Sequence, residues 1–178
     1  MKAVCVYCAS GPVDEEYLVL AARTGEAIAK AGFTLVSGGG NVSMMGSVAR
    51  AAREAGGRTI GIIPEHLMAR EVADLDSDEL IVTDTMRERK RLMDEMSDAF
   101  ITLPGGIGTF EEFFETWTGG FLGEHDKPVV LLNHEGFYDP LLTWLDDLRA
   151  RGFVAQRSLD KLKVCETLGD SIVYLTNR

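Results

Sequence analysis

The sequence is poor in cysteine and in long apolar runs. Its 178 residues include only Cys5, Cys8 and Cys165, too few and too odd a number for the disulfide framework of a small secreted domain. No apolar run approaches the ~20 residues that span a bilayer, and Met1 leads directly into an apolar strand pattern without the features of a secretion signal. These absences predict a cytoplasmic protein with no membrane partner.

Positive charge is also scarce. Lys and Arg total 18 against 28 Asp and Glu, which gives a net charge of −10, and the bases form no long tract. Such a chain repels polyanions, so we expect no nucleic-acid partner. A small anionic ligand would need a local positive feature, such as a helix N-terminus with a few arginines.

Several catalytic and metal-binding motifs are missing. There is no G-x-x-x-x-G-K-[ST] phosphate loop and no G-x-S-x-G elbow, and Gly38-Gly39-Gly40 does not continue as G-x-G-x-x-G, so that triplet marks either a site or a simple turn. Cys5 and Cys8 are expected on opposite faces of a strand, where they cannot share a zinc ion. The three histidines (His66, His125, His134) lie in separate loops without ligand spacing, so we expect no metal site.

What the sequence does contain is an alternation of short, nearly all-apolar strand patterns with helical patterns. This is typical of a parallel sheet covered on both faces, and the length suits one domain spanning residues 1–178. We expect an α/β, Rossmann-like, doubly wound, mainly parallel sheet. The expected strands are 4–8, 33–36, 59–63, 80–83, 99–103 and 129–132; the expected helices are 14–31, 43–55, 85–97, 109–122 and 140–151, with short elements near 163 and 169–175.

In such folds ligands bind beyond the carboxyl ends of the strands. The candidate loops are therefore fixed by the strand assignment: residues 9–12, 37–43, 64–78, 84–86 and 104–109. The segment 64–78 is the longest without clear periodicity, and long irregular loops in compact domains are often functional.

The segment from Pro104 to Glu112 reads P-G-G-I-G-T-F-E-E and joins a strand to a helix. Its glycines allow the backbone to approach a ligand closely, and the free N–H groups of a helix start suit a phosphate. A structural alternative is that the glycines form only a turn and that Thr109 and Glu112 make a capping box. The sequence leaves both interpretations open.

Four bases occur between residues 87 and 91, near the start of an expected helix, where the helix dipole disfavours positive charge. Lys90 and Arg91 are expected to pair with Asp94 and Glu95, four residues on. Arg89 has no acidic neighbour at that spacing. It is therefore either a solvated surface base or a ligand-binding or catalytic arginine, on one helical face with Met86, Lys90 and Met93.

The motifs M-x-x-R-K (86–90) and P-G-G-x-G-T-x-x-E (104–112) together make the chain resemble the LONELY GUY family of cytokinin riboside 5′-monophosphate phosphoribohydrolases, often labelled lysine decarboxylases. The likeness runs from Cys5-Val-Tyr-Cys-Ala-Ser10 through Ser37-Gly-Gly-Gly to Phe153. The resemblance implies a Rossmann-like homodimer, without metal or organic cofactor, that hydrolyses the N-glycosidic bond of adenine-type nucleoside 5′-monophosphates. The products would be the free base and ribose 5-phosphate.

The resemblance also implies residue roles. The catalytic pair would be Arg89 and Glu112. The implied substrate-binding residues are Ser10, Glu71, Met86, Arg89, Lys90, Gly106, Ile107, Gly108, Thr109, Phe110, Glu111, Glu112 and Thr118. Two departures from the family pattern, Ser43-Met44 in place of Gly-Leu and Gly119-Gly120-Phe121 in place of Trp-Ala-Gln, bear on base selectivity and the dimer surface. The N6 substituent that the base carries is left open.

Chemistry assigns the pair different tasks. A carboxylate at Glu112 stabilises oxocarbenium character on the ribose and deprotonates the attacking water, while an arginine, always protonated, orients and stabilises charge. Two alternatives remain from other classes. One is a non-catalytic nucleotide-binding or cofactor-carrier protein; the other is a pyridoxal-phosphate decarboxylase, which needs a Schiff-base lysine for which only Lys90 is a candidate.

Overall fold

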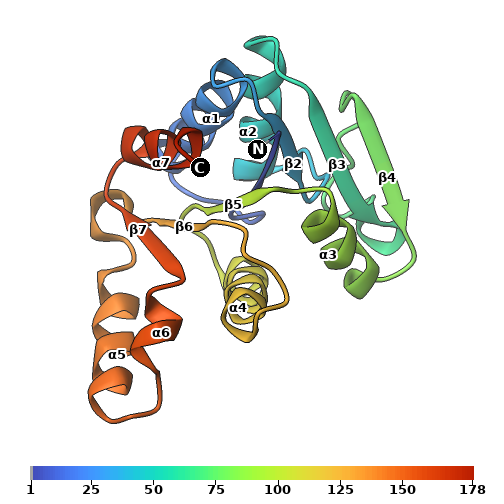
Figure 1. The fold of residues 1–178 in the computed structure, drawn as a ribbon. Coiled ribbons are helices and arrows are strands. Elements are labelled where there is room, and N and C mark those ends of the chain that lie inside the picture. Colours follow the sequence, from blue (N-terminus) through green and yellow to red (C-terminus); the bar gives the residue numbers. More distant parts are fainter. Residues whose placement is uncertain (1) are drawn as a thin grey trace.

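The computed structural model describes residues 2–178. They contain one seven-stranded sheet, and all of its strands run parallel (Figure 1). The strand order is β4-β3-β2-β1-β5-β6-β7. Each pair is linked by a helix or a longer crossover, as parallel pairing requires. The strands are β1 (Ala3–Tyr7), β2 (Thr34–Ser37), β3 (Thr59–Pro64), β4 (Glu79–Thr83), β5 (Ala99–Thr102), β6 (Val129–Leu132) and β7 (Leu162–Cys165).

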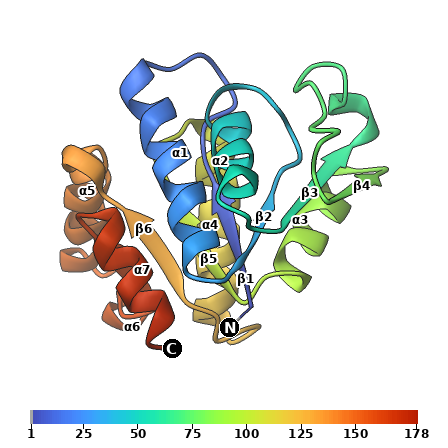
Figure 2. The ribbon, with the colours of Figure 1, turned by 90° about the horizontal axis from the view of Figure 1, so that it is seen from above.

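Helices cover both faces of the sheet (Figure 2). One apolar core lies between the sheet and the helices α1, α2 and α7, and a second lies between the sheet and α3, α4 and α5. Cys8 belongs to the first core and Cys5 to the second, which confirms that they face opposite sides. The helices are α1 (Glu15–Lys30), α2 (Ser43–Glu54), α3 (Met86–Glu95), α4 (Ile107–Leu122), α5 (Asp139–Ala150), α6 (Gln156–Leu159) and α7 (Leu168–Thr176), with 3₁₀ turns η1 (Glu65–Leu67) and η2 (His134–Gly136).

This architecture confirms the predicted α/β, doubly wound class. Strand β1 lies centrally because β2 to β4 extend from one side of it and β5 to β7 from the other. The chain adds β2 to β4 on one side of β1 and then returns to place β5 on the other side of β1. The segments that follow β1 and β5 therefore lead to helices on opposite faces of the sheet. The crevice between those loops is where this class of fold binds ligands.

The predicted elements agree with the observed ones to within a few residues, with two informative differences. Helix α4 begins at Ile107 rather than at 109, because Gly106 serves as its N-cap and Gly108 lies inside its first turn. Glycine disfavours helices, so the pattern placed the start too late. The short helix α6 and the turn η1 were not predicted, since elements of three or four residues show no periodicity.

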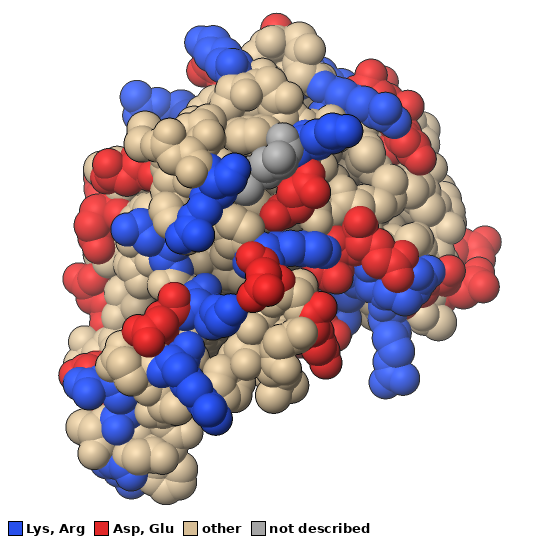
Figure 3. Space-filling model, viewed as in Figure 1, with Lys and Arg blue, Asp and Glu red and all other residues tan. Residues whose placement is uncertain are grey.

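Charged side chains of both signs are mixed on one face of the molecule (Figure 3). On the face drawn in Figure 3, Lys and Arg are interspersed with Asp and Glu. Among residues 2–178, no helix has both the length and the apolar character required to cross a bilayer.

Candidate functional site

A cavity of about 450 Å³ lies at the crevice between the carboxyl ends of β1 and β5. Its walls come from the segments that follow β1, β3, β5 and β6, and from the first turns of α1, α2, α3 and α4. All of these are loops or helix starts at the carboxyl edge of the sheet. The site therefore lies where the strand assignment predicted it.

Most of the predicted binding residues meet at this cavity. The lining includes Ser10, Glu71, Met86, Arg89, Gly106, Ile107, Gly108, Thr109, Glu111 and Glu112. The other three do not line it. Lys90 lines a neighbouring cavity of about 330 Å³ that shares Glu112, Phe110 packs against Tyr138, and Thr118 is exposed on α4.

The start of α4 presents unpaired backbone N–H groups to the cavity. The first hydrogen bond within the helix runs from Phe110 N to Gly106 O, 2.9 Å, so the N–H groups of Ile107, Gly108 and Thr109 have no acceptor inside it. A side-chain carbon at Gly106 or Gly108 would meet no protein atom within 4 Å. These N–H groups are thus open to a ligand, and the helix dipole favours an anionic one.

Glu112 is not part of a helix cap. Because α4 begins at Ile107, Thr109 lies inside the first turn, and the capping-box alternative is wrong. Burial is the main cause that raises the pKa of the Glu112 carboxyl to about 7; Arg89 acts against it, and Glu111 and Glu71 add to it. Among residues 2–178, no hydrogen bond to its carboxylate contributes to this shift in pKa. A carboxyl group that exchanges protons near neutral pH and is free of partners suits acid–base chemistry.

Arg89 is buried, with a side chain only 5% exposed, so the alternative of a solvated surface base is wrong. Its Nε donates to Ile62 O at 3.1 Å and its Nη2 to Gly38 O at 2.9 Å. Its Nη1 faces the Met86 sulfur at 3.7 Å. The guanidinium is therefore fixed in position by the backbone at the ends of β2 and β3.

Gly38 makes this position possible. A side-chain carbon there would lie 1.9 Å from the Arg89 Nη2 atom, so any residue other than glycine would displace the guanidinium. The triplet Gly38-Gly39-Gly40 is consequently more than a turn. Its repetition was the signal in the sequence, but only the fold shows what it accommodates.

Glu71 approaches Arg89 from the loop between β3 and β4. Its Oε2 lies 3.6 Å from Arg89 Nη2, a distance that allows charge attraction but is too long for a hydrogen bond. That oxygen is buried and has no hydrogen-bond partner among the described residues. A buried, unpaired acceptor beside the cavity is suited to a ligand donor.

Lys90 does not pair with Asp94 as predicted. Its ammonium contacts Glu111 and Glu115 on α4, while Asp94 accepts from Lys127 at 3.1 Å. Helix spacing alone does not reveal a partner on a neighbouring helix. The companion prediction is confirmed, because Arg91 pairs with Glu95 at 2.6 Å.

The ionisation of Lys90 follows from these contacts. Partial burial opposes its charge, but the hydrogen bonds to Glu111 and Glu115 outweigh burial and raise its pKa. An ammonium held in this way, outside the main cavity, does not fit the role of a Schiff-base lysine.

The sequence did not reveal the apolar wall of the cavity. Met44 and Met45 come from the first turn of α2, Tyr17 from α1 and Phe137 from the η2 segment. The rings of Tyr17 and Phe137 meet edge to face, with centroids 5.9 Å apart. Ordinary apolar spacing in a sequence does not distinguish a cavity wall from a core.

Known proteins resemble the chain over most of its length. The family described as "Possible lysine decarboxylase" matches residues 45–175. A Mycobacterium tuberculosis protein named cytokinin riboside 5′-monophosphate phosphoribohydrolase is 53% identical over 169 residues, which are 95% of this chain and 90% of that protein. A Mycobacterium marinum protein of the same name is 50% identical over the same shares.

Among solved structures, the molybdenum cofactor binding protein from Rippkaea orientalis is similar in fold. It superposes with a TM-score of 0.74 at 26% sequence identity, covering 99% of this chain and 97% of that one. Its likeness supports the Rossmann-like architecture. The matched family and the two mycobacterial relatives show that the chain belongs to the LONELY GUY family, as the motifs at residues 86–90 and 104–112 predicted.

Proposed function

We propose that this chain, as a single domain, hydrolyses the N-glycosidic bond of adenine or N6-substituted adenine riboside 5′-monophosphates. The products are the free base and ribose 5-phosphate, and the reaction needs no metal or organic cofactor. The observation that carries the proposal is the carboxyl group of Glu112, which has no hydrogen-bond partner among residues 2–178. Burial raises its pKa to about 7, and it lies beside a helix start suited to a phosphate. The names of the relatives point to the same reaction.

In the proposed complex the 5′-phosphate binds the N–H groups at the start of α4, with Ser10 on the facing loop. The ribose then extends toward Glu112, about one helical turn further on. Fixing the phosphate and the carboxylate on one helix presents the anomeric carbon at a constant distance from Glu112, which is catalysis by positioning. The binding energy of the phosphate thereby helps to position the reacting atoms, which raises kcat.

Glu112 acts on the attacking water. As the bond between the anomeric carbon and the base nitrogen breaks, positive charge grows on the ribose, and the carboxylate stabilises it. Glu112 takes a proton from water as the oxygen bonds to the anomeric carbon. The base leaves with the electron pair of the broken bond and takes up a proton from solvent water. Glu112 gives its proton back to solvent, so the enzyme returns to its starting state.

Arg89 keeps its charge close to these groups without donating a proton. Fixed by Ile62 O and Gly38 O, it opposes the rise in the pKa of Glu112 and so maintains a fraction of the ionised form at neutral pH. Glu71 supplies the acceptor for a ribose hydroxyl or the base edge. Met86 and the wall formed by Met44, Met45, Tyr17 and Phe137 suit the apolar faces of the base.

We further propose that the protein acts as a homodimer in the cytoplasm. Several large apolar side chains on α4, α5 and the following segment are exposed: Ile107, Leu122, Trp144 and Phe153. Such side chains are suited to burial against a second copy. The thiols of Cys5, Cys8 and Cys165 are all free, which agrees with a reducing compartment.

A cofactor carrier of the same fold is the second candidate. The Rippkaea protein, which binds molybdenum cofactor according to its name, supports this candidate, but at 26% identity against 53% for the phosphoribohydrolase relative. Binding alone also gives no role to a carboxyl group that titrates near neutral pH. Hydrolysis is therefore the better supported function.

Incubation of the purified protein with AMP and with N6-prenylated AMP should release the free base from at least one of them, as read by chromatography. The phosphate should stay esterified to the ribose, so no inorganic phosphate should be released. Light scattering on the same preparation should give twice the mass of the chain. Tight nucleotide binding without release of base would contradict the proposal and favour the carrier.

Glu112→Gln should reduce kcat by at least about 100-fold, because the amide neither accepts the proton nor stabilises the oxocarbenium charge. The melting temperature should not fall, since Glu112 caps no helix. Glu111→Gln is the matched control: the same change one residue earlier, at a half-exposed side chain on the cavity wall, should lower kcat far less than Glu112→Gln does. Near-normal kcat in Glu112→Gln would remove Glu112 from the chemistry.

The dependence of kcat/KM on pH should rise through about 7 and then level off, because the ionised form of Glu112 is the base and burial holds its pKa there. Glu111→Gln removes a charge that raises this pKa, so it should move the midpoint to lower pH. The substrate phosphate titrates identically with both enzymes and does not contribute to the difference. A profile that falls through 7, or equal midpoints, would rule out this role of Glu112.

A further inference from the structure

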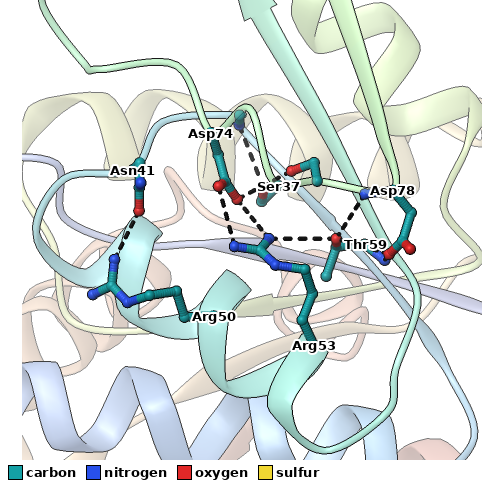
Figure 4. Close-up of polar contacts among 9 residues, drawn as sticks. Ser37, Asn41, Arg50, Arg53, Thr59, Asp74 and Asp78 are labelled. Atoms are coloured by element: carbon teal, nitrogen blue, oxygen red, sulfur yellow. Dashed lines mark hydrogen bonds and ion pairs between the residues drawn. The ribbon is translucent and has the colours of Figure 1, made fainter.

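The loop that carries Glu71 is fastened to α2 by a buried ion pair (Figure 4). Arg53 Nη1 lies 2.7 Å from Asp74 Oδ2 and Nη2 lies 3.1 Å from Oδ1, so the contact is bidentate. The Asp74 side chain is 1% exposed and that of Arg53 18%. A charge buried to this degree is costly unless it is paired, so the geometry of the loop depends on the pair.

Asp74 is tied on its other sides as well. Its backbone N–H donates to Gly39 O at 2.8 Å, and its Oδ2 accepts from Ser77 Oγ at 3.1 Å. Gly39 belongs to the glycine triplet whose first member holds Arg89. Asp74 therefore connects the loop to α2 through its side chain, and through its backbone N–H to the glycine triplet that fixes the guanidinium.

The backbone between Glu71 and Asp74 is strained. Val72 has a φ of +48°, a conformation that is rare for a β-branched residue. Asn41 N donates to both Glu71 O, at 3.1 Å, and Val72 O, at 2.8 Å, and Ala73 forms an antiparallel bridge with Gly40. Such strain persists only where the surrounding contacts hold it.

Apolar burial contributes little to holding this loop. Val72 is 54% exposed and Leu75 77% exposed. The loop nevertheless brings the unpaired Oε2 of Glu71 to within 3.6 Å of Arg89 Nη2. The polar contacts of Asp74 and Asn41 must therefore supply the force that keeps Glu71 in place.

We propose that Arg53 and Asp74 are positioning residues, and that their ion pair holds the strained turn at Val72 so that Glu71 meets the substrate next to Arg89. Neither residue lines the cavity, so we place their effect on the rate in the position of Glu71, which does line it. This inference rests on the proposed function, in which Glu71 accepts a hydrogen bond from the nucleotide. The ion pair is thus a determinant of rate that lies outside the substrate-binding cavity.

Steady-state kinetics on AMP or its prenylated form tests the dependence on Glu71. Asp74→Asn and Glu71→Gln should each lower kcat/KM by about 100-fold, the scale of a misplaced contact. The double variant should be no slower than Glu71→Gln alone, because the ion pair acts through Glu71. Multiplication of the two losses would overturn the inference.

Glu79→Gln is the matched control. It weakens the ion pair of Glu79 with Arg58, which joins the segment before β3 to the start of β4 at 2.7 Å and is exposed at both ends, so kcat/KM should not change. Arg53→Lys keeps the charge and loses the bidentate contact, and it should lower kcat/KM while the protein stays folded. Normal kcat/KM in both Asp74→Asn and Arg53→Lys, with Glu71→Gln impaired, would refute the positioning role and leave the proposed function intact.

Relief of strain provides a readout that a general loss of stability would not give. Val72→Asn suits a positive φ at an exposed position, so in the wild-type background kcat/KM should stay the same. In the Asp74→Asn background it should recover at least tenfold, since the turn then needs less support. Absence of that recovery in a folded double variant would overturn the proposal, and absence of turnover by the wild-type protein would refute the proposed function on which it rests.

Discussion

The positive charge of Arg89 is buried, so protein groups must stabilise it in place of water, and much of the site follows from this constraint. A buried cation without partners would cost several kcal/mol, as is general for ions moved out of water. Two backbone carbonyls, Ile62 O and Gly38 O, accept from it, and the carboxylate of Glu71 lies nearby. The guanidinium occupies the space that a side chain at residue 38 would need, so this position requires glycine. The ends of β2 and β3, the glycine triplet and the loop after β3 are thus organised around one charge.

The same charge balances Glu112. Burial raises the pKa of this carboxyl, and Glu111 and Glu71 raise it further, whereas Arg89 lowers it. The result lies near 7, where both protonation states are populated. A more exposed glutamate would stay ionised and be a weaker base, and one buried without Arg89 would stay protonated. The position of Arg89 is in this way linked to the reactivity of a residue on another helix.

Much of the fold was predictable because apolar periodicity reports burial on either side of a parallel sheet. The positions of most strands along the chain and the loops at their carboxyl ends followed from that pattern, and Arg89 was conspicuous as a base at the unfavourable end of a helix. The order of the strands in the sheet was not predicted, because it depends on which strands pair in the folded chain. The start of α4 was misplaced because glycine hides a helix. The partners of Lys90, the role of Gly38 and the wall formed by Tyr17 and Phe137 were not predictable, since each depends on segments that meet only in the folded chain.

If the start of α4 anchors the 5′-phosphate and thereby presents the anomeric carbon to Glu112, the phosphate must contribute to the rate as well as to binding. The most direct measurement compares kcat and KM for AMP with those for adenosine under identical conditions. We expect adenosine to show a lower kcat as well as a higher KM, with kcat/KM reduced by at least about 100-fold. Equal kcat values for the two substrates would contradict positioning through the phosphate.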